Sequence, residues 1–452
     1  MTSTVLHLGL GAFHRAHQLA YLQDLHDAGD TRWVCVSGNI RPDASDPAPV
    51  LRAQGCAYTL ETVSPQGVRA WRRITALRDA LPWTPDLAEL LAVAASPATR
   101  IVSFTVTEAG YRLDSEGRLD AAADEVQDAL RDYQAGRPGA SIYSVLGAIL
   151  RLRRARDAGP LTLLCCDNLR HNGRRVQRAF RDFLALAGDG ESAAWLDANT
   201  SFPNTMVDRI TPAATPALLE RVRAATGRAD PAAVGAERYI EWVIEDDFRN
   251  GRPAWEKAGA ALVQAVEPYE EAKIRVLNAT HSAIAWAGSL AGYRYIDEAL
   301  RDPRIRALAH GWITDAVFDC LRPSPIDLDA YRDLVLERFG SSATQDTVER
   351  VLSDSFSKLP GFVVPTIRER IGRGLPLDSA ASLPALFLQV LLRWRAGQLG
   401  VAYRDQARDQ AVVDAIGGAA DPVTAFCAQP LFWGELAGDA RLVQAVRSAM
   451  ST

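Results

Sequence analysis

Short apolar runs of strand length alternate with amphipathic stretches of helical length through the first half of the chain. The strand-like runs are Val5–Leu8, Trp33–Ser37, Arg100–Thr107, Leu161–Cys166 and Tyr239–Glu245. The helical patterns include Ala16–Leu25 and a stretch over residues 174–186. This alternation is typical of a mostly parallel β-sheet whose strands are joined by crossover helices. We therefore expect an α/β fold for this half of the chain.

Helical periodicity takes over in the second half. Apolar residues recur at helical spacing in Ile305–Leu321, Ala330–Phe339 and Leu383–Trp394. A chain of 452 residues also exceeds the roughly 250–300 residues at which a single core stops growing. The sequence therefore predicts two domains, an α/β domain over residues 1–262 and a mainly α-helical domain over residues 263–452.

The composition is typical of a soluble globular protein, with 48% hydrophobic and 23% charged residues. A net charge of -5 gives no basic surface for nucleic acid or for an anionic membrane. No apolar run is long enough to span a bilayer, and the first residues do not have the pattern of a signal peptide. The six cysteines form no C-x-x-C pair, which favours buried thiols in a reducing compartment. We expect a cytoplasmic protein that binds neither nucleic acid nor a membrane.

Lysine is almost absent from the chain. There are three lysines, Lys257, Lys273 and Lys358, against 47 arginines (50 basic residues less three). General positive charge is therefore carried by arginine. Arginine cannot lose its proton near neutral pH, whereas lysine can. A lysine that remains is therefore expected at a position where the side chain must lose its proton. Each lysine is thus a candidate functional residue.

A turn with two glycines follows the first predicted strand. HLGLGAFHRAH places Gly9 and Gly11 at the carboxyl end of this strand, where a helix begins. Gly9 permits a tight turn, and Gly11 lets a pyrophosphate approach the backbone and the helix N-terminus. His14 stands where the third glycine of G-x-G-x-x-G is expected, so the motif by itself also fits a plain strand–turn–helix. Its position at the first strand of an α/β pattern favours a dinucleotide site.

Polar residues also follow two other predicted strands, at Thr105–Glu108 and at Asp167-Asn168. Ligands of open α/β sheets bind beyond the carboxyl ends of the strands, although each segment is also typical of a helix cap or a turn. The second strand is followed by Arg41, while Asp43 and Asp46 come later than the acid that reads the ribose of NAD. We expect NAD as the coenzyme, and Arg41 leaves NADP open.

The segment PYEEAKIRVLNATHSAIAWAG (268–288) carries four polar groups on one helical face. Relative to Lys273, and at about 100° per residue, the angles are about 60° for Glu270, 80° for His281 and 140° for Asn278. The apolar Leu277 lies among them, and this mixture is typical of a semi-buried cluster whose polar groups are paired.

These residue types suit the oxidation of an alcohol. A desolvated Lys273 can act as a general base, and the amide of Asn278 can donate to the developing alkoxide. His281 can orient the substrate, and Glu270 can pass the proton to water. The structural alternative is an i, i+3 ion pair between Lys273 and Glu270 beside a buried core histidine. No cysteine has the spacing that would complete a zinc site with His281 or His310, so we expect no metal.

Five segments, in this order, resemble the polyol-specific long-chain dehydrogenases, the family of mannitol dehydrogenase and its relatives. They are GLGAFHRAH (9–17), TVTEAGY (105–111), CDNLRHNG (166–173), FPNTMVDRITP (202–212) and KIRVLNATHS (273–282). The K-x-x-x-x-N-x-x-H spacing of the last segment is the most specific mark. The resemblance covers nearly the whole chain. It implies a Rossmann-like dinucleotide-binding domain followed by an α-helical domain, in a metal-independent enzyme that is commonly monomeric.

The resemblance also implies roles for residues of this chain. The implied catalytic residues are Lys273 as the base, Asn168 and Asn278 as holders of the reacting oxygen, His281 as a substrate contact and Glu270 as the gate for proton exit. The implied substrate-binding residues are Val207, Asp208, Arg350 and Lys358. The implied coenzyme contacts are Gly9, Gly11, Phe13, His14, Thr107 and Glu108.

Within the family, GNIRPDA (38–44) and YTLETVSPQG (58–67) are most similar to the D-arabinitol enzymes. This similarity implies NAD-dependent oxidation of D-arabinitol to the ketose D-xylulose. Oxidation of D-mannitol at C2 is an alternative, as is reduction of a hexuronate (fructuronate or tagaturonate) whose carboxylate Arg350 or Lys358 would bind. A protein of a different class, a dinucleotide-binding sensor without activity, is also open, although a sensor needs no titrating lysine.

Overall fold

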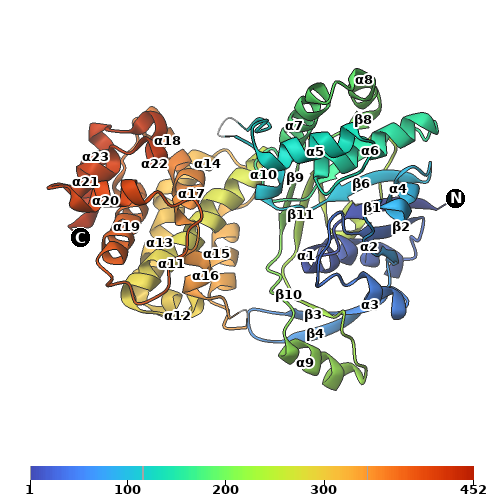
Figure 1. The fold of residues 1–452 in the computed structure, drawn as a ribbon. Helices are drawn as coiled ribbons and strands as arrows, with labels where there is room; N and C mark the ends of the chain where they lie inside the picture. Colours follow the sequence, from blue (N-terminus) through green and yellow to red (C-terminus); the bar gives the residue numbers. More distant parts are fainter. Residues whose placement is uncertain (1, 115–116, 344, 452) are drawn as a thin grey trace. The chain divides into compact units, whose positions relative to one another are not determined.

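The computed structural model describes residues 2–114, 117–343 and 345–451, which form two compact units (Figure 1). The first unit comprises Met1–Ser64 and Val68–Glu267, and the second comprises Pro65–Gly67 and Pro268–Thr452. The chain thus divides five residues beyond the predicted boundary at 262. The predicted fold class is confirmed, because an α/β unit precedes a helical one.

A six-stranded sheet forms the centre of the first unit. Its strands, in spatial order, are β5 (Leu77–Leu81), β2 (Trp33–Gly38), β1 (Ser3–Leu8), β6 (Thr99–Phe104), β7 (Leu161–Cys165) and β8 (Thr200–Ser201). All neighbouring strands are parallel. The order reverses between β1 and β6, and in open parallel sheets such a switch point is where the ligand binds.

Helices cover both faces of this sheet (Figure 1). The helices of this unit are α1 (Ala12–Ala16), α2 (Gln18–Asp27), α3 (Ala48–Ala53), α4 (Ala88–Ala94), α5 (Asp124–Gln134), α6 (Ile142–Ala155), α7 (Asn172–Leu186), α8 (Gly190–Asn199) and α9 (Pro216–Thr226), with short 3-10 turns η1 (Glu108–Tyr111) and η2 (Trp255–Ala258). The last helix, α9, packs against the strands Tyr58–Val63 and Arg69–Ile74 and not against this sheet. Successive strand residues point to opposite faces. Val5 therefore packs in one core with Leu19 of α2, and Leu6 packs in the other with Phe180 of α7.

Two three-stranded sheets complete the first unit. One has the order β10 (Val234–Glu237), β3 (Tyr58–Val63), β4 (Arg69–Ile74), and the other has the order β12 (Ala261–Val263), β11 (Glu241–Glu245), β9 (Thr205–Asp208). Strand β11 confirms the late strand predicted within Tyr239–Glu245. Strands β3, β4, β9, β10 and β12 were not predicted. Three of the six residues of β4 are arginines and half of its residues are exposed, so it has no strong apolar pattern.

The second unit is helical and has one large hydrophobic core. Its α-helices are α10 (Glu267–Ala272), α11 (Ala279–Ala291), α12 (Ile296–Arg301), α13 (Pro303–Gly311), α14 (Phe318–Leu321), α15 (Leu328–Phe339), α16 (Val348–Leu352), α17 (Ser355–Lys358), α18 (Val364–Gly372), α19 (Asp378–Arg395), α20 (Gln410–Gly418), α21 (Pro422–Cys427), α22 (Pro430–Trp433) and α23 (Ala440–Met450), with a 3-10 turn η6 (Gly434–Leu436). Three further segments are π-helical, with hydrogen bonds to the fifth residue back: η3 (Lys273–Asn278), η4 (Trp312–Val317) and η5 (Leu359–Val363).

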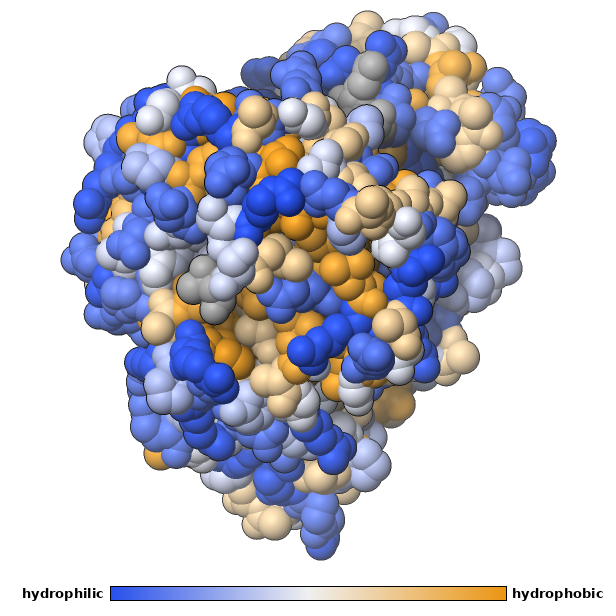
Figure 2. All heavy atoms as spheres, turned by 90° about the vertical axis from the view of Figure 1, so that its left-hand side faces the viewer, coloured by the Kyte–Doolittle hydropathy of each residue, from blue (hydrophilic) through white to orange (hydrophobic). Residues whose placement is uncertain are grey.

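Figure 2 turns the left-hand side of Figure 1 toward the viewer. Hydrophobic side chains reach the surface there in patches between hydrophilic ones. Scattered apolar residues are ordinary on a protein surface. In the part of the chain that the structure describes, no helix has both the length and the apolar character needed to cross a membrane.

Candidate active site

The turn after β1 contains two glycines with different requirements. Gly9 has a φ of +114°, and a Cβ here would lie 3.3 Å from the carbonyl oxygen of Thr105, so the position requires glycine. Gly11 is exposed, and among the described residues no atom beyond its chain neighbours lies within 4 Å of the place of a Cβ. The backbone at the start of α1 is therefore open to a ligand, which suits the pyrophosphate of a dinucleotide. Phe13 is half-buried and stacks on His17 at 4.9 Å.

His14 is buried and fully engaged by the protein. Its ring stacks on His7 at 3.6 Å, its Nε2 contacts the hydroxyl of Ser37 at 2.9 Å, and its Nδ1 contacts Oε1 of Gln18 at 3.2 Å. Burial lowers the pKa of His14 to about 3, so the ring is neutral at physiological pH. Because both ring nitrogens have protein partners, His14 would influence coenzyme binding only indirectly, by stabilising the conformation of the glycine turn after β1.

Asp167 ties the end of β7 to the end of β6. Its carboxylate accepts hydrogen bonds from the N–H groups of Val106 (2.8 Å) and Thr107 (3.1 Å) and from the hydroxyl of Tyr111 (2.5 Å). Burial raises the pKa of Asp167. Thr107 is exposed with a φ of +67°, a left-handed conformation that costs a non-glycine residue about 1–2 kcal/mol. Asp167 thus holds a strained segment at the switch point. The side chain of Glu108 lies outside the described part of the chain.

Asn172 joins the end of β7 to β9. Its Nδ2 donates to the last carbonyl oxygen of β7 (3.3 Å) and to the first of β9 (2.9 Å), and its Oδ1 accepts the N–H of Thr205 at 2.9 Å. Asn168 is exposed at this end of β7, and β9 carries the buried Val207 and Asp208. The first unit therefore brings the segment with Asn168 close to the strand with Val207 and Asp208.

Lys273 opens the π-helical segment η3 and is 7% exposed. The α-helical spacing assumed from the sequence is wrong here, because the N–H of Ala279 donates to Ile274, five residues back instead of four. Such a turn contains about one residue more than an α-helical turn, so successive residues are rotated by about 80° instead of about 100°. Asn278 then lies about 40° from Lys273 instead of about 140°, and His281 about 20° instead of about 80°. The wide turn gathers these three side chains on a narrower face than the sequence indicates.

His281 lies against a buried carboxylate. Its Nε2 is 3.0 Å from Oδ2 of Asp346, without the alignment of a hydrogen bond, and its ring stacks on Phe339 at 4.4 Å. Asp346 also accepts two hydrogen bonds from Arg350, from Nε at 2.7 Å and from Nη2 at 2.6 Å. Burial lowers the pKa of His281, and Asp346 opposes this effect. One carboxylate therefore contacts both His281 and Arg350.

Lys358 belongs to the same group of side chains. Its Nζ donates to the carbonyl oxygens of Val351 (2.5 Å) and Ser353 (2.6 Å). Burial lowers the pKa of Lys358 to about 8, and its charge in turn lowers the pKa of His281. An ammonium group has three donors, and these two carbonyls take two of them.

Sequence analysis missed three residues that hold the predicted site residues in place. Asp346 stands four residues before Arg350, a spacing at which helical ion pairs form and which could have indicated the pair. Asp167 and Asn172 lie in the CDNLRHNG segment, but their partners could not be inferred from it.

The predicted residue Glu270 lies on α10, three residues before Lys273, and is 6% exposed.

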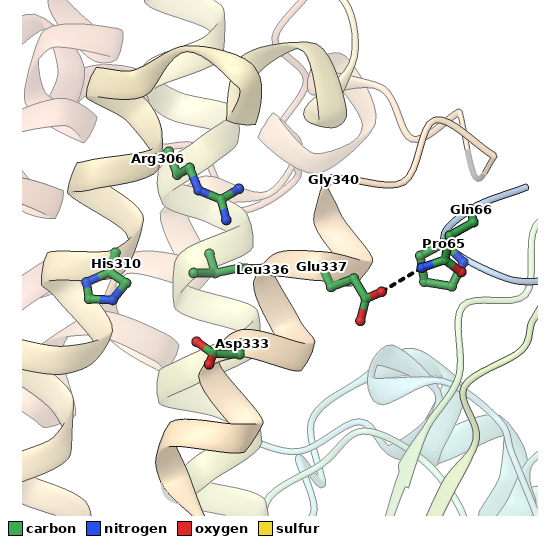
Figure 3. A pocket seen from close by; sticks show the side chains of 8 residues that line it. All are labelled: Pro65, Gln66, Arg306, His310, Asp333, Leu336, Glu337 and Gly340. Atoms are coloured by element: carbon green, nitrogen blue, oxygen red, sulfur yellow. Dashed lines mark hydrogen bonds between the residues drawn. The ribbon is translucent and has the colours of Figure 1, made fainter.

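A pocket of the second unit lies elsewhere (Figure 3). Its lining residues are Pro65, Gln66, Arg306, His310, Asp333, Leu336, Glu337 and Gly340. Gln66 donates to Glu337 at 2.7 Å across this pocket. None of the predicted site residues lines it. Within the described ranges, no group of three or more His, Cys, Asp or Glu side chains is placed to hold a metal ion.

A parallel sheet in this strand order, with an open glycine turn at its switch point, defines a dinucleotide-binding unit. Comparison with known families identifies which enzymes share it. Residues 3–257 match the mannitol dehydrogenase Rossmann domain, and residues 265–452 match the mannitol dehydrogenase C-terminal domain. The chain belongs to the mannitol dehydrogenase family, which confirms the resemblance drawn from its sequence segments.

Individual relatives are similar over nearly their whole length. D-arabinitol 4-dehydrogenase of Ralstonia nicotianae is 52% identical, covering 98% of this chain and 95% of the relative. D-arabinitol 4-dehydrogenase of Klebsiella pneumoniae is 44% identical, covering 99% and 97%. Among solved structures, Pseudomonas fluorescens mannitol 2-dehydrogenase, in a ternary complex with NAD and D-mannitol, matches with a TM-score of 0.85 at 32% identity and covers 100% of this chain and 92% of that chain. The prediction of a polyol dehydrogenase is confirmed at the level of the family.

Proposed function

We propose that the protein oxidises D-arabinitol at C4 to D-xylulose, with NAD as the coenzyme and Lys273 as the general base. The observation that carries the proposal is similarity over nearly the whole chain to two D-arabinitol 4-dehydrogenases, at 52% and 44% identity. Lys273 and Asn278 on the wide turn of η3, together with His281 on α11, support it, since they bring an amine, an amide and an imidazole to one face.

NAD is favoured over NADP by the loop after β2. Asp46 accepts a hydrogen bond from Nδ2 of Asn39 at 3.0 Å, and Oδ1 of Asn39 accepts the N–H of Leu10 in the glycine turn at 2.9 Å. In sheets of this class the loop after the second strand meets the adenosine ribose. A carboxylate tied to the glycine turn would repel a 2′-phosphate. Arg41, the cation that would favour NADP, is exposed on the same loop.

The chemistry divides between the coenzyme and the side chains. NAD, when bound, supplies the nicotinamide ring that accepts a hydride from the alcohol carbon. Lys273 removes the hydroxyl proton, a role that suits a buried amine because desolvation favours its neutral form. Asn168 and Asn278 donate amide N–H groups to the oxygen as it becomes a carbonyl. Glu270, on the preceding helix, takes the proton from Lys273 and releases it to water.

The remaining substrate hydroxyls are assigned to His281, Arg350 and Lys358. Because Asp346 already neutralises Arg350, this guanidinium offers N–H donors without an unpaired positive charge. A neutral polyol needs such donors, whereas a hexuronate would need an unpaired cation for its carboxylate. The Asp346–Arg350 pair therefore makes Arg350 better suited to a polyol than to a hexuronate, and Lys358 is the cation that a hexuronate carboxylate would have to use.

A panel of substrates tests the proposal. NADH formation would be measured with D-arabinitol, D-mannitol and D-sorbitol, and NADH consumption with fructuronate. We expect the highest kcat/KM with D-arabinitol and expect D-xylulose as the product. D-Mannitol is the second candidate, because the solved mannitol 2-dehydrogenase complex shares the fold over the whole chain. A higher kcat/KM with D-mannitol would replace D-arabinitol as the substrate, preference for fructuronate would indicate a reductase, and no turnover on any of them would indicate a sensor.

A further inference from the structure

The wide turn of η3 is bonded to a second wide turn. Trp312 is the first residue of η4, and its indole Nε1–H donates to the carbonyl oxygen of Arg275, inside η3, at 2.9 Å. Trp312 is 1% exposed, so this hydrogen bond is shielded from water. Neither residue is among those assigned to the substrate or the coenzyme.

The indole donates to the carbonyl that the wide turn releases. In a regular α-helix the N–H of Ala279 would donate to Arg275, four residues earlier. In η3 this N–H donates to Ile274 instead. The carbonyl of Arg275 thereby loses its α-helical donor, and Trp312 provides another. Since a buried carbonyl that loses its donor is destabilising, the indole favours the π-helical register over the α-helical one.

The side chain of Arg275 fixes the same turn to two further helices. Its guanidinium donates to Glu271 of α10 at 2.7 Å and to Glu369 of α18 at 2.6 Å. The Arg275 side chain is 12% exposed, so these ion pairs are screened by salt less than a surface pair would be. The backbone and side chain of one residue thus join η3 to α10, η4 and α18.

We propose that Trp312 is a positioning residue for Lys273. Through the Arg275 carbonyl it maintains the register in which Lys273 and Asn278 share a face, and the inference rests on the proposed role of Lys273 as the base. Return to the α-helical register would rotate Asn278 by about 100° relative to Lys273. The amine and the amide would then no longer reach the same substrate oxygen. Trp312 therefore influences the chemical step and the ionisation of the base, and not the binding of the coenzyme.

The substitution Trp312→Phe tests this role, because it removes the indole donor and keeps an aromatic ring. Trp433→Phe is the matched control: Trp433 is also fully buried in this unit and also donates to a backbone carbonyl, that of Phe426, at 2.9 Å. We expect Trp312→Phe to lower kcat for polyol oxidation about 10-fold. We also expect the pH midpoint of kcat to move by at least about half a unit. The Kd of NADH, measured by fluorescence, should stay within about twofold of wild type, and Trp433→Phe should change none of these quantities.

Glu369→Gln is the second variant, for use if Trp312→Phe does not fold. It weakens the Arg275 anchor without removing volume, and we expect it to lower kcat and to shift the pH midpoint of kcat, both by less than the amounts expected for Trp312→Phe. If folded Trp312→Phe matches Trp433→Phe in kcat and pH midpoint, or if it does not fold and Glu369→Gln has no effect, the positioning role is overturned. A wild-type protein that oxidises no polyol would overturn the proposed function and this role together, whereas an active wild type with unaffected variants would overturn the positioning role alone.

Discussion

Asp346 accepts two hydrogen bonds from Arg350, and the carboxylate is only 7% exposed while the guanidinium is 64% exposed. A buried anion thus orients a cation that extends toward solvent. The same carboxylate lies 3.0 Å from Nε2 of His281. Burial by itself would raise the pKa of Asp346, but His281 and Arg350 hold that pKa well below its usual range. The carboxylate therefore stays charged throughout the pH range of an ordinary assay.

Asp346→Asn should weaken substrate binding, because Arg350 and His281 then lose their shared anion. We expect the KM for the polyol to rise about 10- to 100-fold, the scale of one lost hydrogen bond to a charged group, with a smaller change in kcat. Asp421→Asn is the control, since Asp421 pairs with Arg447 at 2.7 Å in the same unit without any assigned site residue. An unchanged KM in Asp346→Asn would show that the anion does not organise the site.

Lys273→Ala should lower kcat at least about 100-fold, the scale of a lost general base. Lys273→Arg should be nearly as damaging, because a guanidinium stays protonated at any assay pH. The Kd of NADH should not change in either variant. Lys257→Ala is the matched control, because Lys257 is an exposed lysine of the first unit. Substantial activity in Lys273→Arg would contradict the role of Lys273 as the base.

Lys358 should make substrate binding depend on pH. Burial lowers its pKa to about 8, so the amine is charged below this pH and loses its charge and one donor above it. Two donors are used by the carbonyls of Val351 and Ser353, so the proton lost above pH 8 removes the donor that would serve a hydroxyl. The KM for the polyol should rise as the pH increases through about 8. Lys358→Met should remove this rise, and a rise that persists in the variant would assign it to another group.

The stacked pair of His7 and His14 should make the first unit sensitive to acid. Burial lowers the pKa of both rings, that of His14 to about 3, whereas the unfolded chain binds these protons near pH 6.5. Stability is therefore fully present above pH 6.5 and falls as the pH decreases below it, by up to about 1.4 kcal/mol per pH unit for each histidine. Urea unfolding at pH 7 and pH 5 would measure the loss. The free energy of unfolding should decrease less between pH 7 and pH 5 in His14→Gln than in wild type. In His310→Gln, at an exposed position, the decrease should match that of wild type.

Excess chelator should leave polyol oxidation unchanged, because the proposed chemistry uses a lysine and two amides where other alcohol dehydrogenases use zinc. Activity would be measured before and after prolonged dialysis against EDTA. A zinc-dependent alcohol dehydrogenase treated in the same way provides the positive control. Loss of activity that Zn²⁺ restores would contradict metal independence.

The hydrophobic pattern was sufficient to predict four of the six strands of the central sheet, and it did not predict β5 or β8. Strands β1, β2, β6 and β7 are buried on both faces, so each is a nearly continuous apolar run that stands out from its surroundings. Strand β4 could not be predicted in this way, because three of its six residues are arginines and only one residue is buried. The pairing of β3 with β10, some 170 residues apart in the chain, also depends on tertiary contacts.

The sequence suggested the residue types of the candidate site but not their geometry. Lys273, Asn278 and His281 were identified by their spacing and by the scarcity of lysine. The register of η3 depends on partners that are distant in sequence, since Arg275 bonds to Trp312, 37 residues away, and to Glu369, 94 residues away. Local periodicity contains no information about such contacts.

The wide turn of η3 bears on any attempt to transplant the K-x-x-x-x-N-x-x-H motif into another scaffold. Copied onto an ideal helix, the lysine and the asparagine would diverge by about 140°, and the grafted residues would have the right identities in an unproductive arrangement. A functional transplant would therefore have to include the nine-residue motif, the π-helical backbone of η3 and Trp312, which stabilises that backbone. Substitutions that convert η3 into a regular α-helix in order to raise thermal stability would be expected to lower turnover.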